Sequence, residues 1–190
     1  MCLENGAFDI VFAVDTRTTS ESVLQHIRDF IHTISVQFPI STNATRIGIV
    51  QFSKEAKSVL HLNQGTSLTN LVPALRSIDS MGAGQNLNEV LSLVRYVEFH
   101  PLLGRRTEYP GLVVLLTGSR SSTTKEELEF WRRSLRSAHA NVVTIGLGSS
   151  MRDKHVTLSG DAVLRVDNFS DLDFSLAQRV VEYICKLSTL

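Results

Sequence analysis

Two apolar segments constrain the fold of this chain more than any other feature. Residues 8–14 have the sequence FDIVFAV and residues 112–117 have the sequence LVVLLT, and neither keeps the alternation of apolar and polar side chains that a half-exposed strand shows. Such segments are typical of parallel strands that are buried on both faces. Because consecutive parallel strands need a crossover connection, we expect helices to lie between the strands and to cover the sheet.

The rest of the sequence alternates strand and helix patterns. Residues 46–52 (RIGIVQF) and 58–62 (SVLHL) are predicted strands so close together that an antiparallel hairpin is the only economical connection, which makes the second an edge strand. Further strands are predicted at 141–146 and 162–166, and helices at 20–36, 67–78, 86–97, after 123, at 151–158 and from 170. We therefore predict one α/β domain over residues 1–190, with a doubly wound, mostly parallel central sheet, one antiparallel edge strand and helices on both faces.

Two helix starts have the spacing of a capping box. In this motif a hydroxyl side chain and an acidic side chain three residues later each accept a hydrogen bond from the other residue's backbone amide. Thr123 with Glu126 predicts the start of one helix, and Ser170 with Asp173 predicts the start of the last.

Charge and hydropathy argue against nucleic acid and the membrane interior as partners. The 19 Lys and Arg residues balance 19 Asp and Glu residues, so no overall field attracts nucleic acid. No apolar run approaches the roughly 18 residues that cross a bilayer, which predicts no membrane insertion. The opening MCLENG lacks the charged and apolar regions of a signal peptide, so we expect the chain to be a domain of a longer protein.

The glycine-containing turns predict neither an enzyme nor a cofactor site. Gly146-x-Gly148 follows a predicted strand, but Met151 stands where a dinucleotide fingerprint needs its third glycine, and Gly82-x-Gly84 fails for the same reason. Ser119 lacks the flanking glycines of a nucleophile elbow, and the six histidines have no metal-ligand spacing. The rival hypothesis is an α/β enzyme that uses a nucleotide, and the missing phosphate-binding loop argues against it.

A cluster of arginines on the predicted helix after Thr123 allows two interpretations. Arg132, Arg133 and Arg136 lie on the polar side of that helix. Clustered guanidinium groups could bind a sulfated glycan, whereas a solvated helix face explains the same pattern without any ligand. The sequence by itself favours the solvated face.

The order and spacing of the strand motifs resemble those of the von Willebrand factor type A domain family. The motifs that carry the resemblance extend over nearly the whole chain: FDIVFAVD, RIGIVQFS, SVLHL, LVVLLTGSRS, VVTIGLG and VVEYIC. The chain resembles in particular the tandem A domains in the amino-terminal part of the collagen type VI alpha-3 chain and in similar matrix proteins. The resemblance implies an extracellular interaction module and not an enzyme.

The resemblance also implies a metal-ion-dependent adhesion site, which this sequence does not preserve. Family members that bind through Mg²⁺ place Asp-x-Ser-x-Ser after the first strand, a Thr in a later loop and an Asp after the fourth strand. Here the first motif runs from Asp15 to Thr19, with Arg17 at the place of the first serine. The loop threonine aligns with Gln85, and Gly118 replaces the second Asp. The loss of a carboxylate and a hydroxyl, with a gained positive charge, disfavours a hard divalent cation.

Asp15 has two possible roles at the end of its strand. An Asp in this position can cap the following turn without any ligand. A carboxylate that is buried still needs compensation, and Arg17, two residues later, carries donors that suit it. We therefore expect Arg17 to pair with Asp15 and to supply the positive charge that a metal would otherwise provide.

The predicted function is a non-enzymatic extracellular matrix module for protein–protein contacts, with a degenerate adhesion site, which contributes to matrix or filament assembly. Expected partners are extracellular matrix proteins, including neighbouring A domains or collagen. A contact through the top loops would use Arg17, Gln85, Ser119 and Arg120 and would need no cation. The alternative is a metal-dependent A domain that binds collagen or mediates cell adhesion.

The two cysteines, Cys2 and Cys185, lie at opposite ends of the sequence. A bridge between them would close almost the whole chain, and in the loop-entropy model it would contribute about 5 kcal/mol to stability. Such a bridge implies an oxidising, extracellular compartment. The sequons at Asn43 and Asn168 are candidates for glycosylation and are compatible with secretion.

We predict that Cys2 and Cys185 are bonded to each other. Secreted protein that is alkylated without reductant should carry no label on either cysteine, and both should be labelled after reduction. Mass spectrometry of the two samples checks this. Two labelled thiols in the unreduced sample would contradict the prediction.

Overall fold

The structure, a computed structural model, describes residues 6–17, 19–118, 122–148, 154–160 and 162–187. These residues form the strands β1 (Asp9–Asp15), β2 (Arg46–Phe52), β3 (Ala56–Leu60), β4 (Gly111–Gly118), β5 (Ala140–Leu147) and β6 (Val163–Val166). The α-helices are α2 (Glu21–Ser35), α3 (Leu68–Arg76), α4 (Leu87–Leu93), α5 (Lys125–Ser137), α6 (Lys154–Ser159) and α7 (Phe174–Leu187). A π-helix, η1 (Val94–Glu98), and two 3₁₀ turns, η2 (Pro101–Leu103) and η3 (Phe169–Asp171), complete the described elements.

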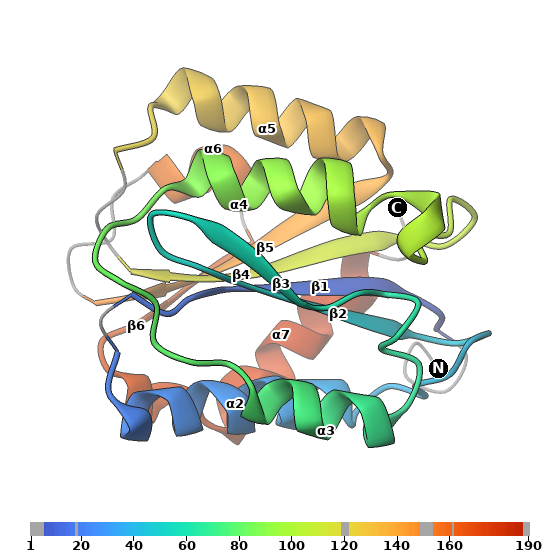
Figure 1. The fold of residues 1–190 in the computed structure, drawn as a ribbon. Coiled ribbons are helices and arrows are strands. Elements are labelled where there is room, and N and C mark those ends of the chain that lie inside the picture. Colours follow the sequence, from blue (N-terminus) through green and yellow to red (C-terminus); the bar gives the residue numbers. More distant parts are fainter. Residues whose placement is uncertain (1–5, 18, 119–121, 149–153, 161, 188–190) are drawn as a thin grey trace.

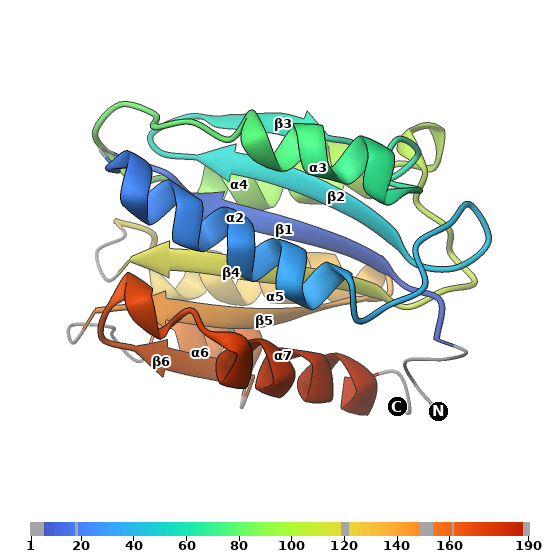
Figure 2. The ribbon, with the colours of Figure 1, turned by 90° about the horizontal axis from the view of Figure 1, so that it is seen from below.

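The strands form one sheet in the order β3-β2-β1-β4-β5-β6 (Figures 1 and 2). Neighbouring strands are parallel except for β2 and β3, which pair antiparallel. The predicted doubly wound sheet with one antiparallel edge strand is confirmed. The chain passes from β1 to β2 on one side, while β4 lies on the other side of β1, so the strand order reverses there. The carboxyl ends of strands at such a point are where open α/β sheets bind ligands.

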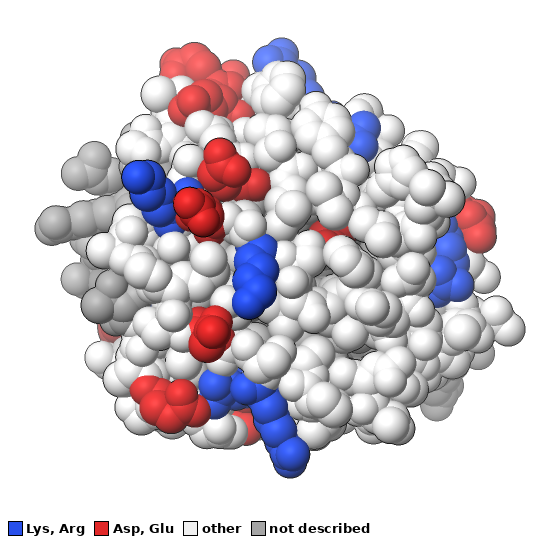
Figure 3. Space-filling view, in the orientation of Figure 1, with Lys and Arg blue, Asp and Glu red and all other residues white. Residues whose placement is uncertain are grey.

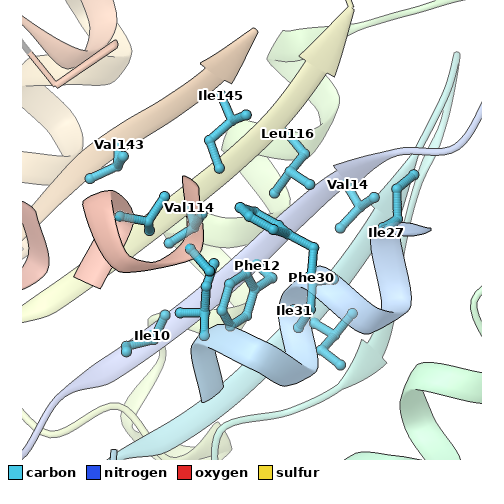
Figure 4. Close-up of a cluster of buried hydrophobic side chains, with 14 of the residues drawn as sticks. Ile10, Phe12, Val14, Ile27, Phe30, Ile31, Val114, Leu116, Val143 and Ile145 are labelled. Atoms are coloured by element: carbon cyan, nitrogen blue, oxygen red, sulfur yellow. The ribbon is translucent and has the colours of Figure 1, made fainter. Parts of the chain in front are cut away.

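Two layers of helices bury the sheet from both faces. Helices α2, α3 and α7 cover one face, and α4, α5 and α6 cover the other (Figure 1). On the first face, Phe30 and Ile31 of α2 pack toward Phe12 of β1 (Figure 4). On the second face, Trp131 of α5 belongs to the core cluster. Every residue of β1 is buried, which explains why its sequence does not alternate.

None of the helices in the described part of the chain is long and apolar enough to span a membrane.

The edge hairpin and the helix after it differ from their predicted extents. Strand β3 ends at Leu60 instead of 62, because His61–Gly65 form a turn in which the His61 carbonyl accepts hydrogen bonds from the amides of Gln64 and Gly65. The helix predicted at 86–97 is α-helical only to Leu93 and continues as the π-helix η1.

Both predicted capping boxes are wrong in position. The box before α5 joins Thr124 with Glu127, because Thr123 is buried and lies before the helix. Before the last helix, the turn η3 forms its own box between Asn168 and Asp171, so α7 starts later than expected. Asp173 then caps α7 directly, and its Oδ1 accepts from the Leu176 amide at 2.8 Å.

Asp9, at the amino end of β1, forms a buried ionic network that the sequence did not predict. Its carboxylate is fully buried and accepts from Arg105 Nη1 at 3.0 Å and from Arg106 Nε and Nη2 at 2.9 and 2.7 Å. Arg105 also donates to the carbonyls of Ala138 and His139, just before β5 and at its entrance. The network ties the start of β1 to the segments that lead into β4 and β5, and it compensates a charge that would be costly to bury alone.

Of the two cysteines, only Cys185 falls in the described part of the chain. It lies in α7 and packs against the core, whereas Cys2 lies outside the described residues, so the bridge between them stays a prediction. The start of β1 and the end of α7 lie at the same end of the molecule, which is compatible with the bridge (Figures 1 and 2). Asn43 and Asn168 are exposed, as glycosylation would require.

We predict that Asp9→Ala lowers the free energy of unfolding by about 3–5 kcal/mol, because it leaves two arginines without their buried counter-ion. Urea denaturation measures the change. Asp167→Ala is the matched control, since Asp167 is exposed and outside the network, and we expect it to change stability by less than about 0.5 kcal/mol. A loss at Asp9 no larger than in this control would show that the network contributes nothing.

Candidate functional site

The candidate site lies at the carboxyl ends of the two central strands. Asp15 is the last residue of β1, and Gly118 is the last residue of β4. Gln85 reaches the same place from the loop before α4. That loop runs beside the residues after β1, because the Met81 amide donates to the Thr16 carbonyl at 2.9 Å. The switch point of the sheet thus brings together residues that are far apart in sequence.

The Asp15 carboxylate is the centre of the site. It is almost fully buried, and its Oδ2 accepts from Gln85 Nε2 at 2.9 Å and from the Gly118 amide at 3.2 Å. Its Oδ1 accepts from the Arg17 amide at 3.3 Å, which is the geometry of a capped turn. Arg17 Nε lies 3.4 Å from Oδ2 and forms an ion pair with it. Both roles considered for Asp15, the turn cap and the partner of Arg17, are therefore present.

Gln85 bridges the other groups of the site through both ends of its amide. Besides Asp15, its Nε2 approaches the Thr117 hydroxyl and the Gly118 carbonyl, the latter at 3.4 Å. Its Oε1 accepts from Arg17 Nη1 at 3.4 Å. The amide group therefore holds the guanidinium and the carboxylate in one hydrogen-bonded cluster.

Gly118 leaves the space that the Arg17 side chain fills. A Cβ at position 118 would collide with Arg17 Nη2 and would lie 3.7 Å from Asp15 Oδ2. The absence of a side chain at position 118 and the presence of Arg17 in the site are therefore physically coupled.

Thr19, the last residue of the degenerate motif, does not contribute to the cluster. Its hydroxyl donates to the Arg17 carbonyl at 2.9 Å, and its amide donates to the Ser80 hydroxyl at 2.9 Å. Ser119 and Arg120 lie outside the described residues, so their predicted part in binding stays a prediction.

Sequence reasoning missed three further features of the site. Thr117 and Ser80 are hydrogen-bonded to its residues, and Thr117 could have been found from its place at the end of a buried strand. The third feature is an open cleft of about 480 Å³ beside Arg17, which no local pattern predicts. Its walls include the apolar residues Val23, Leu147 and Phe169, together with Asp167.

The described residues do not fit the divalent cation that the resemblance implies. Such a cation needs several oxygen ligands, of which carboxylates are the strongest. Here the cluster has one carboxylate, both of whose oxygens already accept hydrogen bonds, and the Arg17 guanidinium lies against it. Nowhere in the described residues do three or more His, Cys, Asp or Glu side chains form a group that could hold a metal.

Burial raises the pKa of the Asp15 carboxyl above its ordinary value, because the charged form loses hydration. The Arg17 charge and the amides of Gly118 and Arg17 lower the pKa, but they offset only part of this effect. A proton is therefore bound more tightly in the folded chain than in the unfolded one. The stability that this contributes is fully present below the unfolded-state pKa and is lost as the pH rises through the raised pKa.

We predict that Asp15→Asn removes this pH dependence. The free energy of unfolding of the wild type, minus that of the variant, should fall as the pH rises through the acid range. Urea denaturation at a series of acidic to neutral pH values measures the difference. In an Arg17→Gln background the same difference should fall by more and up to a higher pH, since the change removes the charge that lowers the pKa of Asp15. A difference that is constant with pH, or that rises with it, would contradict the assignment.

Comparison with known proteins agrees with the fold. The family model described as the von Willebrand factor type A domain matches residues 9–179. The mouse collagen alpha-6(VI) chain is 26% identical over 182 residues, which cover 93% of this chain and 8% of the collagen chain. Mouse matrilin-2 is 20% identical, with 97% of this chain and 20% of matrilin-2 covered. This chain thus spans only a small part of these relatives.

Solved structures with the same fold include proximal thread matrix protein 1 from the mussel byssus. It superposes with a TM-score of 0.86 at 20% identity, over 95% of this chain and 49% of that one. A second structure of the mussel protein, described as having a zinc-occupied MIDAS motif, has a TM-score of 0.85. The match of the family model over most of the sequence, together with the sheet order described above, shows that the chain belongs to the von Willebrand factor type A domain family.

Proposed function

We propose that this domain is a non-enzymatic extracellular matrix module that makes protein–protein contacts through the carboxyl edge of its sheet, without a divalent cation. The observation that carries the proposal is the Arg17 guanidinium, which pairs with Asp15 at the switch point of the sheet. The collagen and matrilin relatives support a secreted, matrix location. The expected role is a contribution to matrix or filament assembly.

The electrostatics of the site support a contact without a metal. In a metal-dependent site, the cation supplies the positive charge that attracts a partner carboxylate. Arg17 carries a permanent positive charge at the same edge, and its side chain is 30% exposed. On the face shown in Figure 3, Lys and Arg residues are interspersed with Asp and Glu, so attraction must come from a local group and not from a large field of one sign.

The cleft beside Arg17 suits a segment of mixed character. Arg17 and Asp167 offer opposite charges on its walls, and Val23, Leu147 and Phe169 offer apolar surface. Among the described residues that line the cleft, the large aromatic side chain is Phe169, which is half-buried and therefore not exposed enough to act as a dominant anchor. The contact is therefore polar and of moderate strength.

The same geometry argues against catalysis at this edge. Asp15 is engaged by Gln85, Gly118 and Arg17, which leaves no carboxylate oxygen free to act as a base. Within the described residues of the cluster, no hydroxyl is paired with a histidine or a lysine that could activate it.

The alternative is a metal-dependent A domain that binds collagen or mediates cell adhesion. The mussel protein described with a zinc-occupied MIDAS motif shares the fold and makes this alternative worth testing. For this chain it would require that Arg17 leave the site and that another group replace the carboxylate missing at Gly118.

We predict that binding to matrix partners persists in EDTA and depends on Arg17. Immobilised type VI collagen and an immobilised second copy of the domain are the probes for surface plasmon resonance. Arg17→Ala should weaken binding about tenfold or more, as expected for the loss of a charge-assisted hydrogen bond. Arg76→Ala is the matched control, because Arg76 is an exposed arginine at the end of α3, away from the site. Complete loss of binding in EDTA would reject the proposal.

Calorimetric titration of Mg²⁺ and Mn²⁺ separates the two hypotheses directly. The wild-type domain should show no binding. Arg17→Ser combined with Gly118→Asp should begin to recover it, because the pair of changes removes the guanidinium and restores the second carboxylate. Stoichiometric binding of either ion by the wild type would favour the metal-dependent alternative.

A further inference from the structure

Helix α5 carries three arginines that make no ion pair within the described chain. Arg132, Arg133 and Arg136 form no hydrogen bond or ion pair with any described residue. Arg28 and Arg106, by contrast, donate to carboxylates and carbonyls. The α5 arginines therefore keep their hydrogen-bond donors available to a ligand.

Two of these arginines face a small cleft between α5 and α6. Arg132 and Arg136 are four residues apart, so they lie on the same side of the helix. Together with Asn141 of β5 and Ser159 of α6 they line a cleft of about 60 Å³. The Ser159 hydroxyl is hydrogen-bonded to the buried Thr144 hydroxyl, which fixes its position. The polar groups in the walls are thus two guanidinium groups, an amide and a hydroxyl, and the apolar residues Ala140, Val142 and Leu158 complete the described lining.

The described residues that line this cleft do not balance its charge. None of the described residues that line it is acidic. The larger cleft between α2 and α3 also contains two arginines, Arg28 and Arg76, but it includes Asp29. Like charges four residues apart on a helix repel each other by a few tenths of a kcal/mol. An anion between Arg132 and Arg136 would relieve this repulsion.

The size and donors of the cleft define the ligand. The cleft is small, about 60 Å³, so it suits a single small anionic group, such as one tetrahedral oxyanion, better than a whole sugar ring. Guanidinium groups match such oxyanions through paired N–H donors. Arg133 is exposed on the outer surface of α5, where it can contact the next anionic group of an extended polymer.

We propose that the α5–α6 cleft binds a sulfate group of an extended sulfated glycosaminoglycan. Arg132 and Arg136 contact the sulfate, and Arg133 contacts the adjoining part of the polysaccharide. This site is separate from the carboxyl edge of the sheet and does not depend on the contact proposed there. The arginine cluster in the sequence is thus assigned as a ligand site and not as a solvated helix face.

Heparin binding to the whole chain tests the proposal. Arg132→Gln combined with Arg136→Gln should weaken binding about tenfold or more, because it removes two charge-assisted contacts. Arg76→Gln combined with Arg179→Gln is the matched control: it changes the net charge equally, at exposed arginines of α3 and α7 on the other face of the sheet. The control should bind within about twofold of the wild type. An equal loss in both double variants would show that only net charge matters and would overturn the proposal.

Footprinting of the wild-type chain tests the same site without any substitution. Heparin should protect Arg132 and Arg136 from an arginine-modifying reagent, and it should leave Arg76 and Arg179 reactive. Desulfated heparin should protect neither pair, and inorganic sulfate should compete at least as well as inorganic phosphate. Equal protection by sulfated and desulfated chains, or competition by phosphate alone, would overturn the assignment to a sulfated glycan.

Discussion

The central strand β1 is buried along its whole length and carries a carboxylate at each end. Asp9 and Asp15 would each cost several kcal/mol if they were charged and unpaired in this position. Asp9 is compensated by two arginines from the segment before β4. Asp15 is compensated by Arg17, Gln85 and a backbone amide. The loops at both ends of the sheet are consequently held against the same strand by the need to pair these two charges.

The Asp9 carboxylate is more fully compensated than the Asp15 carboxylate, and this difference bears on function. The Asp9 network is enclosed, with both guanidinium groups almost fully buried, so it acts as a structural tie. At Asp15 the single guanidinium is part-exposed, and burial still raises the pKa of the carboxyl. The carboxyl end is therefore the less enclosed end of β1, and it opens into a cleft. Perturbed pKa values are more common at functional sites than elsewhere in a protein.

Family membership by itself does not decide what this domain binds, because one fold carries many sites. At the carboxyl edge, the residues at positions 17 and 118 depend on each other, because a side chain at position 118 and the observed position of Arg17 exclude each other. The α5–α6 cleft lies elsewhere on the molecule and has a different chemistry, because its described lining contains two arginines and no acidic residue. The two proposed contacts, with a protein partner and with an anionic polysaccharide, would therefore use different surfaces of one domain.

The sequence by itself determined the α/β class and the mostly parallel sheet with one antiparallel edge strand, because hydrophobic periodicity is a property of neighbouring residues. The family resemblance, and not any local pattern, placed Asp15, Arg17, Gln85 and Gly118 in one site. It did not determine the exact helix starts, since the burial of Thr123 and the turn η3 shifted both capping boxes. The Asp9 network and the two clefts were decided only by the tertiary structure. Asp9 and Arg106 are 97 positions apart, and the cleft beside Arg17 extends to Phe169. No short-range pattern records which side chains the sheet topology will bring into contact.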